Sequence, residues 1–415
     1  MAETLKLGNG IWATKDNSLL SYNDENGNYK PLPFDFTRAS SATVVNKAGL
    51  IETVGTGIPR IDFLGNTNGA LLLEPQRTNL ALYSDAFDNA YWTKEGTSIV
   101  SDTATSPDGT LNADKLVEGT NTGLHRTYSN LITTVLGNDY TTSVFAKKGE
   151  RNIFGIQMSN GSQPFVWFNL DTGVVELQEA GMVGKIEPII NGWYKCTASW
   201  NSSSATTDRV FIQLAKSTVD TSYTGDGTSG IYLYGAQLEQ ASYPTSYIPT
   251  QGSTVTRVAE TCSGAGNDQV INSTEGVFYF EGSALANDGT NRFLSIDDGT
   301  TANYIYFRYT TDDNQCLFRT NVGGVTINTL STFITDATQN HKFAYKFKSG
   351  DYAMWIDGVE IATDTSPTIF APNTLDNIVF SFPTDGGGGF ASKTKDIRVY
   401  NTALTDAELQ ALTTI

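Results

Sequence analysis

The sequence is poor in positive charge, in histidine and cysteine, and in long apolar runs. Lys and Arg total 27 against 44 Asp and Glu, which gives a formal net charge of −17 and a pI near 4.5. A nucleic-acid partner requires concentrated positive charge to replace the counterions of its phosphates, so this balance argues against such a partner. No apolar run approaches the ~18 residues of a membrane helix, and the segment MAETLKLGNGIWATK lacks the apolar core of a signal peptide. We therefore expect a soluble chain that does not insert into a membrane and is made in a reducing compartment.

Cysteine and histidine are too few for the common catalytic and metal-binding arrangements. Cys196, Cys262 and Cys316 are odd in number and far apart, so they cannot all pair within one chain, and none belongs to a C-x-x-C motif. A histidine-based triad or a multi-histidine metal site would have to form around His125 or His341 alone. The sequence thus predicts inert thiols, no catalytic residue, no metal ligands and no cofactor.

The segment GGGFASKT, residues 387–394, imitates a phosphate-binding loop without its essential parts. Ser392 stands in place of the glycine that precedes the lysine, and the segment leads into a predicted strand. Because the helix N-terminus that would hold the phosphate is missing, we interpret this segment as a flexible loop.

Acidic residues are numerous enough to form chance pairs, and glycoside hydrolysis requires only two carboxylates. The candidates are Asp297–Asp298, Asp312–Asp313 and Glu239. Neighbouring Asp residues in a strand point to opposite faces, and in a loop they usually remain solvated. We therefore predict that the protein is not an enzyme. A structural Ca²⁺ on an acidic turn is the alternative use of such residues, although no loop has EF-hand spacing.

Glycine and aromatic residues are abundant. The chain contains 39 Gly, 21 Phe and 19 Tyr, while charged residues make up only 17% of it. This composition favours short strands and turns over long helices. We predict an all-β fold with an extended N-terminal attachment region, two antiparallel β-sandwiches and one short C-terminal helix.

Four regions follow from changes in pattern along the chain. Residues 1–33 are polar and interrupted by Gly and Pro, which indicates an arm or attachment segment. Residues 34–79 form short extended pieces that are too few to bury a core alone; a neighbouring domain or identical chains would have to cover their apolar side chains. Residues 80–259 and 260–415 each have the strand and turn spacing of a β-sandwich.

Alternating side chains are clearest in the first sandwich region. In GIYLYGAQLE, Ile231 and Leu233 face one way while Tyr232 and Tyr234 face the other. Strong turn signals recur at intervals of about ten residues along the same region. This combination favours two packed antiparallel sheets.

The second sandwich region carries two local signals of high specificity. Asp357–Gly358 between apolar arms is the strongest hairpin signal in the chain. Near the end, Thr405 can cap a helix with Glu408 at the capping-box position, and Leu409 lies on the apolar face of that helix.

Several of these segments resemble known families. FTRASSATVVNKAGLIETVGTGIPRIDF and GALLLEPQRTNL resemble a stretch common in bacteriophage head-fibre and tail-fibre proteins. The motifs SDAFDNAYWTK, SVFAKKG, GWYK and YLYGAQLEQASYPTSYIPT that follow are similar to the jelly-roll carbohydrate-binding modules of phage spikes. GVFYFEG, WIDGVE and KDIRVYNTALTDAELQAL resemble a laminin-G or concanavalin-A-like sandwich.

The resemblance implies a virion fibre or spike subunit, made in the host cytoplasm and placed on the virion surface. Such proteins are usually homotrimers, with an N-terminal segment that contacts other virion proteins and lectin-like domains that face outward. The residue pattern agrees, because identical subunits would help to bury the thin region 34–79. Related modules occur on both heads and tails, so the location on the particle stays open.

Aromatic side chains are the remaining candidates for recognition of a glycan, since a ring offers an apolar surface to the C–H groups of a sugar. In NYIYFRYTT, Tyr304, Tyr306 and Arg308 share one face, which is either a ligand platform or a subunit contact. Tyr91 and Trp200 are further candidates, with core packing as the alternative role of each ring.

Three functions are compatible with these observations. The first is an adhesin that binds a host-surface or environmental glycan without cleaving it. The second is a purely structural appendage that decorates the capsid or docks other virion proteins. The third is a polysaccharide depolymerase, which the lack of an evident acid–base pair and of a repeating β-helix pattern disfavours.

Overall fold

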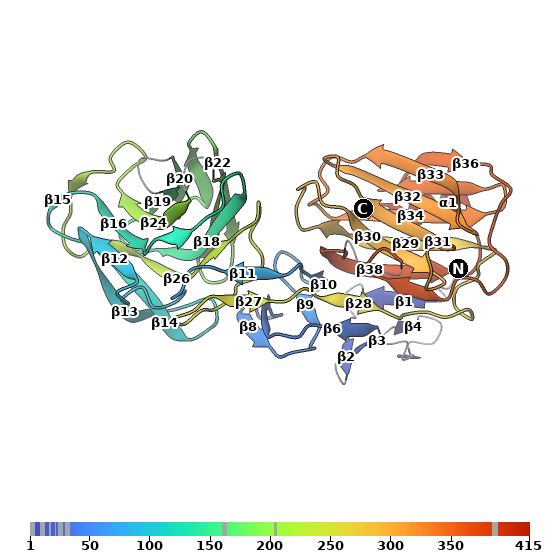
Figure 1. Cartoon of the computed structure of the whole chain (residues 1–415). Coiled ribbons are helices and arrows are strands. Elements are labelled where there is room, and N and C mark those ends of the chain that lie inside the picture. Colours follow the sequence, from blue (N-terminus) through green and yellow to red (C-terminus); the bar gives the residue numbers. More distant parts are fainter. Residues whose placement is uncertain are drawn as a thin grey trace. The chain divides into compact units, whose positions relative to one another are not determined.

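A computed structural model of the chain describes residues 34–159, 164–202, 206–383 and 389–415, together with the strands β1 (Leu5–Gly8), β2 (Ala13–Lys15), β3 (Ser18–Leu20), β4 (Tyr22–Asn23) and β5 (Asn28–Tyr29). The predicted attachment arm, residues 1–33, otherwise lies outside the described residues, and so do Gly387 and Gly388 of the segment GGGFASKT. Within the described part the only helix is α1 (Asp406–Thr413), so the predicted all-β class with one short C-terminal helix is confirmed (Figure 1). None of the described helical residues forms a helix long and apolar enough to span a membrane.

The chain forms two compact units and passes between them several times. Unit 1 comprises Met1–Ser41, Val54–Gln76 and Val258–Ile415, and unit 2 comprises Ala42–Thr53 and Arg77–Arg257. The sequence pattern predicted one separate region over residues 34–79. The structure instead divides these residues between the two units.

Unit 2 contains two antiparallel sheets (Figure 1). The six-stranded sheet has the order β13-β14-β26-β18-β23-β22, and the seven-stranded sheet has the order β12-β16-β24-β19-β20-β21 with β17 paired to β24. Their strands are β12 (Trp92–Glu95), β13 (Thr97–Thr105), β14 (Leu111–Glu118), β16 (His125–Ser129), β17 (Ile132–Thr133), β18 (Asp139–Lys148), β19 (Ile153–Ser159), β20 (Phe165–Asn169), β21 (Val174–Gln178), β22 (Met182–Pro188), β23 (Trp193–Asn201), β24 (Thr207–Ala215) and β26 (Gly230–Glu239). Short pairs join β11 (Arg77–Asn79) to β27 (Val255–Arg257) and β15 (Thr122–Gly123) to β25 (Tyr223–Thr224).

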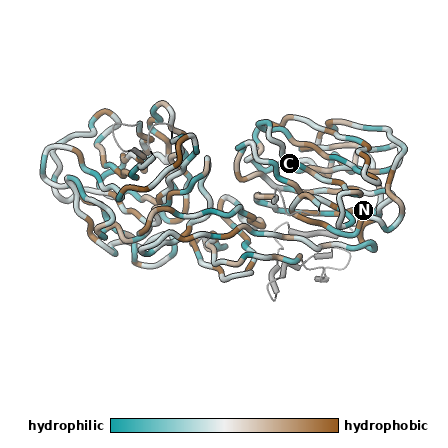
Figure 2. The backbone as a smooth tube through the Cα atoms, in the orientation of Figure 1, coloured by the Kyte–Doolittle hydropathy of each residue, from teal (hydrophilic) through white to brown (hydrophobic). Residues whose placement is uncertain are grey.

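The core of unit 2 follows from the two-residue period of its strands. Ile231 and Leu233 of β26 are buried between the sheets, while Tyr232 and Tyr234 pack in a separate cluster on the outer face of the six-stranded sheet. Apolar residues accordingly alternate with polar ones along many strands (Figure 2). The predicted division of this strand into two faces is confirmed.

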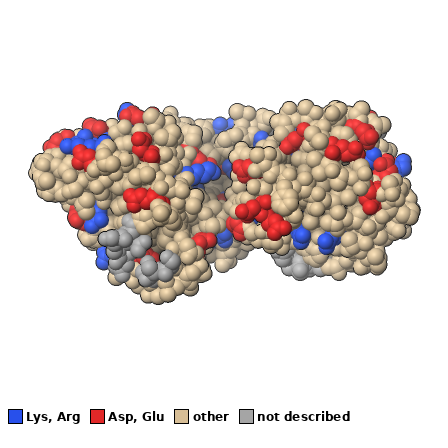
Figure 3. Space-filling model, turned by 90° about the horizontal axis from the view of Figure 1, so that it is seen from above, with Lys and Arg blue, Asp and Glu red and all other residues tan. Residues whose placement is uncertain are grey.

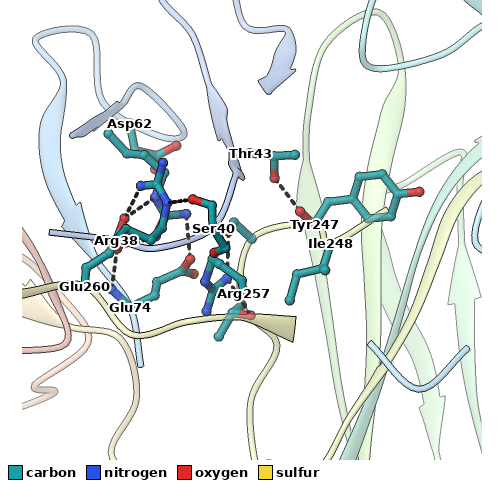
Figure 4. Close-up of polar contacts among 12 residues, drawn as sticks. Arg38, Ser40, Thr43, Asp62, Glu74, Tyr247, Ile248, Arg257 and Glu260 are labelled. Atoms are coloured by element: carbon teal, nitrogen blue, oxygen red, sulfur yellow. Dashed lines mark hydrogen bonds and ion pairs between the residues drawn. The ribbon is translucent and has the colours of Figure 1, made fainter. Parts of the chain in front are cut away.

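The hairpin of β7 (Ala42–Val45) and β8 (Ile51–Val54) supplies apolar cover for that outer cluster. Ile51 belongs to the same buried cluster as Trp193. The Thr43 hydroxyl donates to the carbonyl oxygen of Tyr247 at 2.6 Å (Figure 4). The backbone N–H of Ile51 donates to the carbonyl of Pro107 at 2.9 Å. The first part of the thin region is therefore buried within its own chain.

Unit 1 contains a ten-stranded and a five-stranded sheet. The first follows the path β36-β35-β34-β29-β38-β1-β4-β5, with β10 paired to β38 and β9, and the second has the order β33-β32-β31-β30-β37. Outside β1, β4 and β5, the strands are β9 (Arg60–Asp62), β10 (Ala70–Leu73), β29 (Glu275–Ala284), β30 (Arg292–Asp297), β31 (Tyr304–Tyr309), β32 (Gln315–Val322), β33 (Val325–Phe333), β34 (His341–Lys348), β35 (Tyr352–Ile356), β36 (Val359–Asp364), β37 (Asn377–Val379) and β38 (Ser392–Tyr400). A separate pair joins β6 (Asp35–Thr37) to β28 (Thr261–Ser263), and another joins β2 to β3.

Early residues complete the core of this second sandwich. Phe34, Leu71 and Leu73 lie in the main buried cluster together with Phe278 and Ile397 from the central strands β29 and β38. Burial against a neighbouring domain, one of the two predicted alternatives, is thus realised within the chain. An intersubunit role of residues 34–79 stays a prediction, but burial of these apolar side chains does not require it.

The predicted C-terminal helix is present, and it packs on the outer face of the ten-stranded sheet. The hydroxyl of Thr405 accepts the backbone N–H of Glu408, and the Glu408 carboxylate accepts the backbone N–H of Thr405. Leu409 of α1 packs with Trp355 of β35. The predicted hairpin at Asp357 is present as well, and Asp357 has the positive φ of 50° that a tight turn of this type requires.

A buried network of ion pairs joins the three parts of unit 1 (Figure 4). Glu260 lies at its centre: Oε1 accepts Arg38 Nη1 at 2.7 Å and Oε2 accepts Arg60 Nη2 at 2.5 Å. Arg60 also pairs with Glu74 at 2.7 Å, and the side chains of all four residues are at most 4% exposed. Burial alone would lower the pKa of Arg60, but the two carboxylates raise it above its usual range, so the guanidinium remains charged.

Replacement of Glu260 tests how far unit 1 depends on this network. We expect Glu260→Ala to lower the free energy of unfolding of unit 1 by about 3–5 kcal/mol, because it leaves two buried arginines without their shared carboxylate. Denaturant unfolding of the full chain, followed by probes that resolve two transitions, measures this change. The matched control is Glu187→Ala, whose partner Lys185 is 65% exposed, and we expect a change of at most about 1 kcal/mol. Equal effects of the two substitutions would contradict the central role of Glu260.

Candidate functional site

Aromatic and charged side chains gather on the outer face of the five-stranded sheet in unit 1. In β31, Ile305 and Phe307 enter the core. Tyr304, Tyr306 and Arg308 alternate with them and therefore lie on the opposite face. The predicted shared face of these three residues is confirmed.

The strand register extends this outer face onto neighbouring strands, because directly paired residues lie on the same face of an antiparallel sheet. The pairs that flank β31 are Arg308 with Phe293 and Leu317, Tyr306 with Ser295 and Arg319, and Tyr304 with Asp297 and Asn321. On the same face of β32, Gln315 is paired with Phe333 of the edge strand β33. Phe333 is 66% exposed, so it presents an open aromatic ring at the rim of the face.

The centre of this outer face is an aromatic floor formed by Phe293, Tyr304, Tyr306 and Phe382. The rings of Tyr304 and Tyr306 stack with centroids 5.2 Å apart, and Phe293 meets Tyr306 edge-on at 5.2 Å. Phe382, from the segment after β37, lies 5.7 Å from Tyr304 and 5.9 Å from Tyr306. Tyr304 and Tyr306 are only 7% and 1% exposed, so the expected open platform is instead a buried floor. Burial raises the pKa of both phenols, although Arg319 opposes the shift, and both remain neutral.

Two half-buried arginines lie over this floor. The Cζ atom of Arg308 is 5.6 Å from the centroid of the Phe293 ring, and that of Arg319 is 5.7 Å from the Tyr306 ring. Arg319 Nε donates to the hydroxyl of Thr329 at 3.0 Å, whereas Arg308 Nε has no hydrogen-bond partner among the described residues. Neither guanidinium forms an ion pair with a described carboxylate, although acidic groups are widespread on the surface in Figure 3.

Asp297 also lies on this outer face, and its carboxylate is hydrogen-bonded to neighbouring residues. Its Oδ1 accepts the backbone N–H of Gly299 at 2.9 Å and Asn377 Nδ2 at 3.1 Å. Burial raises the pKa of Asp297 to about 6, since the side chain is almost fully enclosed. Its neighbour Asp298 binds Thr300 and Asn303 in the following turn, and there these hydrogen bonds outweigh burial and lower the pKa. The two carboxylates therefore do not work as one pair.

The other carboxylate candidates also have separate environments. Glu239 is buried and accepts hydrogen bonds from Thr245 and Gln237 in unit 2. Asp312 and Asp313 are exposed in a turn of unit 1. Among the described residues, no three His, Cys, Asp or Glu side chains lie close enough together to hold a metal ion.

Tyr91 and Trp200 lie in unit 2, whereas the residues of β31 belong to unit 1. Tyr91 is 4% exposed and packs edge-on against Trp92 with centroids 5.3 Å apart, so its ring belongs to the core and offers no open surface. Trp200 is half-buried and stacks on Tyr140 at 5.8 Å. Core packing, the alternative role of these rings, describes Tyr91 fully and Trp200 in part.

The histidines and cysteines are enclosed as well. His125 bonds through its two ring nitrogens to the carbonyl groups of Gly96 and Tyr223. His341 Nδ1 lies 2.6 Å from the carboxylate of Asp357, and its Nε2 lies 3.0 Å from the carbonyl oxygen of Asp336. All three cysteines are buried and unpaired, and burial raises the pKa of Cys196, which disfavours the reactive thiolate.

A second aromatic surface lies on the outer face of the seven-stranded sheet in unit 2. Tyr128 and Phe211 are 5.0 Å apart there, and Phe165 stacks on Trp167 at 4.7 Å. Gly155 permits this stack, because a Cβ atom at that position would lie 2.8 Å from both of these rings. The sheet register places both ring pairs on this face.

The most exposed site residue, Phe333, and the second arginine, Arg319, were missed in the sequence analysis. Both lie on strands whose alternation is visible, but their place on the same face as Tyr306 and Arg308 depends on the pairing of β31, β32 and β33. Phe382 comes from a loop and carries no periodic signal at all. A predicted meander of β31 to β33 would have been sufficient to find the first two.

Part of unit 1 matches a known family. Residues 283–410 match the family described as the concanavalin A-like lectin/glucanases superfamily, and this range contains all strands of the five-stranded sheet. The expected concanavalin-A-like character of the C-terminal sandwich is confirmed over this range. No curated protein sequence matches the chain.

The chain has low similarity to several solved structures. The IT-sialidase CBM40 of Ruminococcus gnavus bound to α2,3-sialyllactose is 19% identical and covers 34% of this chain and 83% of its own, with a TM-score of 0.30. Domain 4 of an extracellular arabinanase from Geobacillus stearothermophilus, in complex with arabinotriose, is 15% identical and covers 42% of this chain and 84% of its own, with a TM-score of 0.30. A heptameric SAP-like pentraxin from Limulus polyphemus is 14% identical, with a TM-score of 0.27, and covers 34% of this chain and 70% of its own.

Titration of Asp297 makes the stability of unit 1 depend on pH. Its pKa of about 6 in the folded state lies above the ordinary value of 3.8, so the folded state binds the proton more tightly. The resulting stabilisation of the folded state is complete below pH 3.8 and is lost as the pH rises through 6. We expect unit 1 to be more stable at pH 5 than at pH 7.5 by about 1 kcal/mol from this group.

Thermal unfolding of the full chain across this pH range measures the effect. Asp297→Asn removes the titration and is expected to flatten the profile of unit 1. Asp312→Asn removes the same charge from an exposed turn and is expected to keep the slope. Identical profiles for the two variants would contradict the assignment to Asp297.

Proposed function

We propose that this protein binds glycans without cleaving them and that the outer face of the five-stranded sheet is a binding site. The observation that carries the proposal is that the exposed Phe333 ring lies on the same sheet face as Arg308 and Arg319. An aromatic ring packs against the C–H surface of a sugar, while guanidinium, hydroxyl and amide groups bond to its oxygens. The family match of residues 283–410, whose description includes lectins, supports the same function.

Binding rather than hydrolysis is proposed because the candidate carboxylates Asp297, Asp298 and Glu239 have separate environments. Glycoside hydrolysis requires two carboxyl groups that face one bond from roughly 5–9 Å apart. Asp297 is held by Gly299 and Asn377, while Asp298 is bound within its own turn. Neither this pair nor Glu239 has the arrangement of an acid and its partner carboxylate.

The second aromatic surface gives the proposal a further candidate site, at which Phe211 and Trp167 are buried as Tyr304 and Tyr306 are. Tyr128 and Phe211 in unit 2 are accompanied by Arg126, whose Cζ lies 4.8 Å from the Phe211 ring. Weak sites in several copies would increase avidity about 10²–10⁴-fold without any new contact. A multi-site protein of this kind suits adhesion to a surface.

The biological setting of this binding is proposed from the resemblance of residues 36–63 and 69–80 to phage fibre proteins. We place the chain in a homotrimeric head or tail fibre, with residues 1–33 contacting other virion proteins and the sandwiches facing host or environmental glycans. A purely structural appendage without a ligand is the second candidate, and a depolymerase is the third.

Substitution of Phe333 tests the glycan-binding face with little risk to folding. We expect Phe333→Ala to weaken glycan binding at least about fivefold, because an aromatic contact contributes about 1 kcal/mol. The measurement is a glycan array followed by titration calorimetry, with the full chain at concentrations that detect millimolar sites. Val359→Ala, on the edge strand β36 of the other sheet and 58% exposed, is the control and should bind as the unchanged chain does.

Three outcomes separate the candidate functions. Binding that depends on Phe333 supports an adhesin, and absence of binding to any glycan favours the structural appendage. Release of saccharide from host envelope material would favour the depolymerase and contradict a function without cleavage.

Removal of residues 1–33 tests the proposed place in a virion. We expect the truncated chain to remain folded, because the described members of the main buried cluster of unit 1 all follow residue 33, although the pairing of β1 with β38 is lost. We also expect it to lose incorporation into particles, which immunoblotting of purified virions measures. Normal incorporation of the truncated chain would contradict the attachment role.

Light scattering of the full chain should give the mass of a trimer, and a monomeric mass would contradict the trimer.

A further inference from the structure

Arg308 and Arg319 form a cationic pair that the described chain leaves without a counterion. Arg308 of β31 is paired with Leu317, and Arg319, two residues further along β32, is paired with Tyr306, so the arginines are diagonal neighbours on one face. Diagonal neighbours have Cβ atoms about 7–8 Å apart. Two like charges at this distance repel each other unless an anion lies between them.

The lack of an ion pair at these two arginines contrasts with Arg126 and Arg398, which also lie over aromatic rings but are each paired with a carboxylate. Arg126 of unit 2 also contacts Phe211, but its Nε donates to Glu95 at 2.8 Å. Arg209 lacks a described ion pair as well, yet it stands on that face beside an arginine that is already neutralised. Only the pair on the five-stranded sheet, among the described residues, brings two unneutralised guanidinium groups together on one aromatic surface.

The arginines are also held in an orientation that suits an anion. Arg308 lies over Phe293 and Arg319 over Tyr306, so the rings support both planar groups from below. The hydroxyl of Thr329 accepts from the Nε of Arg319, and the phenol of Tyr304 also hydrogen-bonds to the Arg319 side chain, so both neighbours fix its position. A guanidinium fork matches the two oxygens of a carboxylate or sulfate, and such charge-assisted bonds are about twice as strong as neutral ones.

We propose that Arg308 and Arg319 bind the anionic group of an acidic saccharide, and that this group is a sugar carboxylate. This inference rests on the proposed function and specifies the ligand class of the same site. The Phe333 ring packs against the apolar surface of the sugar, and the two guanidinium groups bind its carboxylate. Sulfated sugars present a similar anion, so the experiment includes them as a separate arm.

Matched pairs of probes test the charge of the ligand directly. The full chain is titrated with oligogalacturonate and its methyl ester, with sialyllactose and lactose, and with a sulfated and an unsulfated galactan oligosaccharide. We expect at least one carboxylated probe to bind about tenfold or more tightly than its neutral partner. The affinity of this probe should fall as NaCl rises from 50 to 300 mM, because the two arginines are partly exposed and salt screens their attraction to the carboxylate.

Variants assign that preference to the two arginines. Arg308→Gln and Arg319→Gln should each weaken binding of the carboxylated probe about tenfold and leave the neutral probe nearly unchanged. Arg319→Lys keeps the charge but not the fork, so it should retain the salt dependence and recover part of the affinity. Lys348→Gln removes the same charge from an exposed ion pair on β34 and serves as the control with unchanged affinity. Thermal unfolding verifies that each variant is folded.

The outcomes distinguish failure of this inference from failure of the proposed function. A carboxylate preference that depends on both arginines supports the inference. Equal affinity for the carboxylated probes and their neutral partners would overturn it while glycan binding stands, and so would a preference for sulfated probes alone. If no glycan on the array binds and Phe333→Ala has no effect, the proposed function fails and this inference fails with it.

Discussion

Unit 1 depends on the carboxylate of Glu260, which meets Arg38 and Arg60 in a fully buried position. The chain enters this unit at its beginning, leaves it, returns with residues 54–76, leaves again and returns at Val258. Apolar burial alone is not directional, whereas an ion pair between buried groups accepts only one arrangement of its partners. Glu260 therefore selects which of the separated segments meet, and the apolar side chains Phe34, Leu71 and Leu73 then complete the core.

This dependence explains why the local structure was predictable and the assembly was not. Alternation in the strands, the Asp357–Gly358 turn and the capping box at Thr405 each involve residues close in sequence, so a local pattern is sufficient to predict them. The division of residues 34–79 between two units rests on partners that are some two hundred positions away, such as Arg38 and Glu260. No period or turn signal records such a pairing, and the sequence pattern therefore suggested a separate thin region.

The candidate site shows the same limit at smaller scale. A two-residue period is enough to place Tyr304, Tyr306 and Arg308 on one face, but it does not determine what covers that face. Tyr306 is enclosed because Phe293 arrives from the paired strand and Phe382 from a loop. The same strand register that buries the predicted tyrosines places Arg319 and Phe333 on this face. The accessible groups are therefore the guanidinium groups and the Phe333 ring at the rim, and not the tyrosine rings.

The net charge of −17 repels an anionic ligand, and this repulsion constrains how such a ligand would bind. At physiological salt, charges more than about 8 Å apart are largely screened, so distant carboxylates have little effect on a ligand already bound at this face. The excess of negative charge still opposes electrostatic steering of an acidic glycan toward the protein and slows their encounter. Recognition would have to come from short-range contacts with Arg308, Arg319 and Phe333, and the binding energy of one such small face is limited. Several copies of the face acting together would then supply the residence time that a single weak site cannot, which connects the chemistry of this face to a multi-copy assembly.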